Sequence, residues 1–300
     1  MSPELNAYFH AVPPVAYNMG GTEAVPAIYH YTTYEGLHGI IGSQELRAAN
    51  IHYLNDYTEF KHALEIASIK VEDRIRSGVK PETPLLMAVR SQLDTIRKIS
   101  VCVACFSEKP DDLGQWRGYA GKSGVAIAFR YRDLHFSAQS QGFRILRCIY
   151  DNETKQRFVD HTLDDAVASY VGPPGPSAEA TIAMAQTLIW NIDALAPAFK
   201  HSGFSEEREW RLVSAPRPMN HERMGYRSTA ESLIPYFKFD LRSKLPGLNP
   251  TKENLGIGQI IIGPSRYQQA NSDSVGGMLL RNRIDIVTII NSQVPYRTGP

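Results

Sequence analysis

Short apolar strands and amphipathic helices follow one another along this chain in an irregular order. Helical spacing of apolar residues follows Thr32 and Asp56 and recurs near 84–99, 152–170 and 177–199. Strand-like runs include SVCVACFS (100–107), GVAIAF (124–129), GFRILRCIY (142–150), EWRLVSA (209–215), LIPYFKFD (233–240), GQIIIG (258–263) and DIVTIIN (285–291). A doubly wound parallel sheet needs regular alternation of strand and helix. The order here therefore predicts the α+β class.

The organisation predicted from these patterns is simple. Residues 1–26 are rich in Pro, Gly and small residues and are predicted to form an N-terminal arm. Residues 27–300 are predicted to be a single α+β domain. The helical segments near 152–199 are predicted to be an insert in that domain, because the strands on either side read as one sheet.

Composition excludes few classes of partner. The hydrophobic content of 43% is enough for a sizeable core, and the net charge of +1 gives no general attraction to nucleic acid or membrane. The N-terminus lacks a basic segment followed by an apolar run, and nothing approaches the roughly 20 apolar residues of a membrane helix. We therefore expect a cytoplasmic protein.

Two of the three cysteines have the spacing of a redox motif. Cys102 and Cys105 lie in a predicted strand, where side chains three positions apart face opposite sides. A dithiol or shared metal site is therefore not expected, and we predict buried structural thiols and no metal site.

The first strand carries a histidine where a core residue is expected. His30 and Thr32 are two positions apart in IYHYTT and so project to one face of that strand. Thr32 with Glu35, and Asp56 with Glu59, have the spacing of helix capping boxes, which gives these residues an adequate structural role. A single histidine in a strand is also more often structural than catalytic.

Two later clusters concentrate polar and aromatic groups. The segment QWRGY places Gln115, Trp116, Arg117 and Tyr119 in a short turn, where an aromatic ring is either part of the core or a stacking wall for a planar ligand. In FSEEREWRLV, Glu207 and Glu209 would project to one side of an extended chain. Paired carboxylates repel, which tends to raise one pKa. The alternative to a functional role for these glutamates is an exposed acidic turn whose carboxylates pair with neighbouring arginines.

The order of these motifs resembles a bacterial family known as domain of unknown function 2971. The pattern runs from HYT and LND through CFS, QWRGY, GVAIAF and FSEEREWRLV to IIIGP and PYR, and covers nearly all of residues 28–297.

More loosely, the chain resembles the ADP-ribosyltransferase-like superfamily. The resemblance rests on three features: a strand with His-x-Thr before a helix that begins with GL..I, a later aromatic-rich strand and helix, and a strand that begins with glutamate. The resemblance implies split β-sheets that clamp NAD in a bent form.

That resemblance also implies roles for individual residues. His30 would anchor a ribose with Tyr31 and Thr32 beside it, and Glu209 would be the catalytic glutamate. Glu207 would complete the Glu-x-Glu pair of the members that modify arginine. Trp116, Arg117 and Tyr119 would contact the nucleotide, with Trp116 or Tyr119 stacking on nicotinamide.

Three classes of function follow as hypotheses. The first is an NAD-consuming enzyme, an ADP-ribosyltransferase or NAD glycohydrolase, of the kind found in toxins and antiviral defence effectors. It would use NAD as a substrate, with a protein or nucleic acid as a further acceptor. The second is a non-catalytic module that senses a nucleotide. The third is a metal-dependent nuclease or a phosphotransferase that acts on RNA.

Overall fold

The structure is a computed structural model that describes residues 27–54, 58–96, 101–121, 123–170, 176–242, 255–284 and 287–295. These residues divide into two compact units. The helical unit is drawn from the described residues within 51–101 and 146–205, and the sheet unit from those within 27–50, 102–145 and 206–295. The N-terminal arm predicted for residues 1–26 lies outside the described residues. The single domain predicted for 27–300 stays a prediction.

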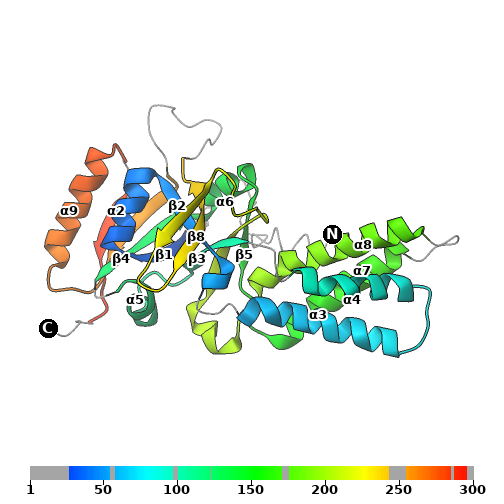
Figure 1. The fold of residues 1–300 in the computed structure, drawn as a ribbon. Coiled ribbons are helices and arrows are strands. Elements are labelled where there is room, and N and C mark those ends of the chain that lie inside the picture. The colour runs from blue at the N-terminus through cyan, green and yellow to red at the C-terminus, as the bar shows by residue number, and fades with distance from the viewer. Residues whose placement is uncertain are drawn as a thin grey trace, which may run out of the picture. The chain divides into compact units, whose positions relative to one another are not determined.

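The helical unit is built from helices that lie alongside one another (Figure 1). They are α3 (Thr58–Arg76), α4 (Thr83–Ile96), α7 (Asn152–Tyr170) and α8 (Ala178–Leu195), with short 3₁₀ turns at Ile51–Tyr53 and Ala196–Ala198. The apolar face predicted for the second of these helices is confirmed, because Leu85, Val89 and Leu93 are buried at spacings of four residues.

The sheet unit holds ten described strands in a mostly antiparallel sheet. They are β1 (Ala27–Thr33), β2 (Glu45–Asn50), β3 (Cys102–Ser107), β4 (Gly124–Arg130), β5 (Phe143–Arg147), β6 (Glu209–Ser214), β7 (Met224–Ser228), β8 (Leu233–Asp240), β9 (Ile257–Ile262) and β10 (Thr288–Asn291). The main order is β10-β9-β4-β1-β3-β2-β8-β7, while β6 pairs with β3 and β5. Only the β9–β10 pair is parallel among the registered pairs of the described strands. The predicted α+β class is confirmed.

Four helices accompany this sheet, namely α2 (Tyr34–Ser43), α5 (Leu113–Tyr119), α6 (Tyr131–Ser140) and α9 (Gln268–Arg281). The sequence patterns did not predict α6, α9 or strand β7. Helix α9 buries only Val275 and Leu279 among its residues, so its apolar stripe is too thin to be recognised. Strand β7 is largely exposed and has no alternating apolar pattern.

The first helix is capped one residue later than predicted. Strand β1 continues through Thr33, whose Oγ1 accepts a hydrogen bond from the Gly36 N–H at 3.1 Å. The predicted capping box of Thr32 and Glu35 is therefore wrong, because Thr32 still belongs to the strand. The second predicted box includes Asp56, which lies outside the described residues.

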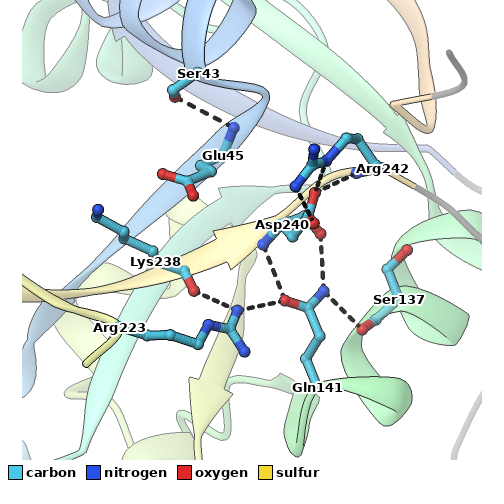
Figure 2. A network of polar contacts seen from close by, with 8 residues as sticks. All are labelled: Ser43, Glu45, Ser137, Gln141, Arg223, Lys238, Asp240 and Arg242. Atoms are coloured by element: carbon cyan, nitrogen blue, oxygen red, sulfur yellow. Dashed lines mark hydrogen bonds and ion pairs between the residues drawn. The ribbon is translucent and has the colours of Figure 1, made fainter. Parts of the chain in front are cut away.

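Helix α6 is fastened to strand β8 by a single carboxamide (Figure 2). Gln141 Nε2 donates to the carbonyl oxygens of Ser137 at 3.1 Å and Asp240 at 2.8 Å. Its Oε1 accepts from the Asp240 N–H at 2.9 Å and from Arg223 Nη2. Both donors and both acceptor positions of this amide are filled.

The described helices were compared in length and apolar content with a membrane span. Within the described ranges, none is both long and apolar enough to cross a membrane.

Candidate functional site

A small cavity opens where strands β1 and β3 separate. The two strands share the register pair Tyr29 and Ser107, whereas β1 pairs with β4 along its whole length. The space open to the centre of a water molecule is about 70 Å³. One water needs roughly 10–15 Å³ on this measure, so the cavity has room for a single small ring. Its walls are formed by Tyr29, His30, Tyr31, Cys105, Phe106, Gln115, Tyr119, Glu207 and Glu209.

His30 reaches this cavity from strand β1 and bridges the separation to β3. Its Nδ1 lies 2.9 Å from the carbonyl oxygen of Cys105. Because a carbonyl only accepts hydrogen bonds, Nδ1 must carry the proton, and in the neutral ring Nε2 then keeps its lone pair. Burial lowers the pKa of His30 against the opposing effect of that hydrogen bond, so the ring is neutral near pH 7. The geometry makes His30 an acceptor for a hydroxyl or amide.

The residues of QWRGY lie on different faces of helix α5. Asp112 begins the helix by accepting a hydrogen bond from the Gln115 N–H at 3.1 Å. Gln115 and Tyr119, four residues apart, share one face, and both line the cavity. Trp116 points into the core instead, with Ala120, Ala126 and Ile261.

Trp116 and Arg117 are therefore placed apart from the cavity lining. Trp116 is 2% exposed, and its Nε1 donates to Asp111 Oδ1 at 2.7 Å. Arg117 is exposed on the outer face of the helix. Of the two rings considered for stacking, the structure brings Tyr119 to the cavity, where it is 40% exposed.

Tyr31 and Thr32 have different surroundings. Tyr31 lines the cavity, and its Oη donates to the Lys109 carbonyl at 2.8 Å and accepts from the Asp112 N–H at 3.1 Å. Its ring packs edge-on against Trp116 at 4.7 Å between centroids, and burial raises its pKa. Thr32 lies against Gly36, where a Cβ would come within 2.0 Å of its Oγ1. Tyr31 thus joins the cavity wall to the base of α5, and Thr32 packs against α2.

The two glutamates reach the cavity by a turn. Glu207 ends a 3₁₀ turn (Ser202–Glu207), Arg208 has a left-handed φ of 45°, and Glu209 begins β6. The extended chain predicted across 207–209 is therefore wrong. Ser107 Oγ donates to the Glu207 carbonyl at 2.7 Å, and the Glu108 N–H donates to the Arg208 carbonyl at 3.1 Å, which fixes the turn.

Each glutamate has a defined neighbour. Tyr119 Oη donates to Glu207 Oε1 at 3.1 Å at the exposed side of the cavity. Glu209 is 4% exposed and pairs with Arg211, Nε to Oε1 at 2.7 Å and Nη2 to Oε2 at 3.4 Å. Arg211 faces Cys105 across the β3–β6 ladder, and the Cys105 carbonyl in turn holds His30. One strand register therefore positions both His30 and Glu209.

The sequence interpretation missed Gln115, Tyr29, Cys105 and Phe106 as cavity residues. Gln115 could have been found, because it stands four positions before Tyr119 in a predicted helical turn. The cysteines behave mostly as expected, since Cys102 and Cys148 are buried, whereas Cys105 is half-buried and lines the cavity. Burial raises the pKa of Cys102 to about 11.

The comparisons with known proteins give one match. Residues 115–212 match the family described as Protein of unknown function (DUF2971). This segment covers less than half of the chain and supports the family resemblance there. It includes Gln115, Tyr119, Glu207 and Glu209 but not His30. No curated protein and no solved structure matches the chain.

Among the described side chains, no group of three or more His, Cys, Asp or Glu could hold a metal ion together.

Proposed function

We propose that this protein is an NAD-consuming enzyme with an ADP-ribosyltransferase-like fold and that the cavity between β1 and β3 is its active site. One observation carries the proposal. His30 of β1, Tyr119 of α5 and the neighbouring Glu207 and Glu209 line the same cavity, although they come from three distant parts of the sequence. These are the residue types that the superfamily resemblance assigns to ribose, nicotinamide and the reacting carbon.

The proposed chemistry uses each group in a distinct way. Cleavage of the bond between nicotinamide and ribose passes through a state with oxocarbenium character, which a nearby carboxylate stabilises. Glu207 and Glu209 supply the carboxylates. The neutral His30 accepts a hydrogen bond from a ribose hydroxyl through Nε2, and the Tyr119 ring offers a surface for the nicotinamide ring.

The size of the cavity sets how NAD would bind. A volume of about 70 Å³ holds one ring, whereas pockets that enclose whole ligands of drug size span roughly 300–1,000 Å³. The nicotinamide end would therefore enter, and the rest of the dinucleotide would lie across the mouth.

Nicotinamide release from NAD tests the proposal directly. Wild-type protein is incubated with NAD, with and without candidate protein or nucleic-acid acceptors, beside Glu207→Gln. A lost carboxylate contact of this kind lowers the rate by about 10²–10³. Glu206→Gln is the matched control, because Glu206 is 92% exposed, pairs with Lys109 and does not line the cavity.

Other outcomes assign the protein to the other classes. Binding of NAD or ADP-ribose without any release of nicotinamide would favour the sensing module. RNA cleavage that stops on chelation would favour the metal-dependent nuclease. If nicotinamide release is found, growth of a bacterial host that expresses wild type or Glu207→Gln tests whether depletion of cytoplasmic NAD, or modification of a target, makes the protein a toxin or defence effector.

A further inference from the structure

Gln115 has a carboxamide that borders the cavity and has no hydrogen-bond partner in the described part of the chain. The residue is 6% exposed and lines the cavity. Its backbone N–H is used by Asp112, but its side chain makes no hydrogen bond to any described residue. Its amide atoms are not among the fully enclosed side-chain atoms of the described residues that lack a partner, so they border the open space of the cavity. An amide in that position is available to a ligand that both donates and accepts hydrogen bonds.

Gln141 shows how the same side chain is used when its purpose is structural. All of its hydrogen-bonding positions are filled by Ser137, Asp240 and Arg223 (Figure 2). Gln115 differs in that its donors and acceptor border open space. The contrast indicates that Gln115 is kept for a group that enters the cavity.

The position of Gln115 defines what that group looks like. A carboxamide donates and accepts at once, so it pairs best with another group that does both in one plane. Tyr119 stands one helical turn further along on the same face of α5, where its ring can lie against a planar ligand. The cavity has room for one such ring.

We propose that Gln115 is a specificity-determining residue that recognises an amide edge on a planar ring by paired hydrogen bonds. With NAD as the ligand, this edge is the carboxamide of nicotinamide. The general statement rests on the geometry of the cavity, and its application to nicotinamide rests on the proposed function.

Comparing two ligands on two proteins tests whether the Gln115 amide pairs with the amide of the ligand. Binding of nicotinamide and of 3-methylpyridine, which lacks the amide, is measured by ligand-observed NMR on wild type and Gln115→Met. Wild type should prefer nicotinamide by about 10- to 100-fold, and Gln115→Met should lose that preference. Gln139→Met, which changes an exposed glutamine of the same unit, should keep it.

Thermal stability separates recognition from a structural role. Because the Gln115 amide makes no hydrogen bond within the described part of the chain, Gln115→Met should leave the melting temperature close to that of wild type. A clear fall in melting temperature with an unchanged ligand preference would overturn the inference.

Measuring NAD turnover distinguishes a failure of this inference from a failure of the proposed function. If wild type binds nicotinamide through Gln115 but never releases it from NAD, the enzymatic proposal fails and the inference stands. If wild type turns NAD over and Gln115→Met does so with the same KM and kcat, the enzymatic proposal stands and the inference is wrong.

Discussion

Glu209 and Arg211 form a buried two-point ion pair on one face of β6. Arg211 Nε lies 2.7 Å from Oε1 and Nη2 lies 3.4 Å from Oε2, and the two side chains are only 5% and 4% exposed. The pair fixes the plane of the carboxylate at the cavity wall. It also means that Glu209 contributes to folding as well as to any chemistry.

Glu209→Gln should therefore be destabilising as well as inactivating. Removing one partner of a buried ion pair typically costs about 3–5 kcal/mol, and here the buried Arg211 guanidinium would lose the Glu209 carboxylate that contacts it at two points. Adding Arg211→Met to Glu209→Gln should recover much of this loss. Denaturant unfolding of the single and double variants measures both effects. Equal stability of Glu209→Gln and wild type would show that the pair adds nothing to folding.

Tyr119 should act through its ring rather than its hydroxyl. Tyr119→Phe removes the exposed 3.1 Å hydrogen bond to Glu207 and keeps the ring, so stability and NAD affinity should change little. Tyr119→Ala removes the ring face and should weaken NAD binding by about tenfold, the effect of roughly 1.4 kcal/mol. Calorimetric titration with NAD compares them. Strong loss of affinity in Tyr119→Phe would instead assign the role to the hydroxyl.

His30 should make the protein less stable in mild acid. Burial lowers its pKa in the folded state, whereas the unfolded chain binds a proton near the ordinary value of about 6.5. The unfolded state then holds more protons as the pH falls below that value, so stability is full above it and declines toward the folded-state pKa. Below that folded-state pKa the contribution is constant.

Unfolding curves of wild type and His30→Asn between about pH 5 and 8 measure this contribution, as the difference in slope of stability against pH. The variant should have the flatter slope. NMR titration of the His30 ring gives the pKa itself, and a value at or above the ordinary one would contradict the assignment of a neutral ring.

The local elements were predictable where the apolar period was strong. The spacing of Leu85, Val89 and Leu93 is enough to predict their helix. The apolar runs at 100–107 and 124–129 likewise predict strands. Helix α9 and strand β7 were not predictable, because long-range packing rather than an apolar pattern holds them in place. Their sequences are nearly as polar as those of loops.

The site was predictable in its residue types and not in its geometry. His30, Tyr119, Glu207 and Glu209 were chosen from motifs, but sequence cannot show that β1 and β3 separate and leave a cavity. The left-handed turn at Arg208 is likewise fixed by tertiary hydrogen bonds from Ser107 and Glu108. The sequence allowed Trp116 to lie either in the core or in the cavity. It lies in the core, because it is on the face of α5 that packs against Ala126 and Ile261.

Gln141 should contribute to the stability of the fold, whereas Gln115 should not. Gln141→Leu would leave the Asp240 N–H and carbonyl, the Ser137 carbonyl and the Arg223 guanidinium without the amide that now joins them (Figure 2). Loss of a half-buried network of this kind should cost about 1–3 kcal/mol.

The control for this variant is Gln139→Leu, an exposed change two residues away that should stay within about 0.5 kcal/mol of wild type. Denaturant unfolding followed by tryptophan fluorescence gives the free energies. Because the network joins α6 to β8 and lies apart from the cavity lining, NAD turnover per folded molecule should not change in Gln141→Leu. If Gln141→Leu unfolds at the same denaturant concentration as Gln139→Leu, the filled amide is not what fastens α6 to the sheet, and the contrast with Gln115 loses its meaning.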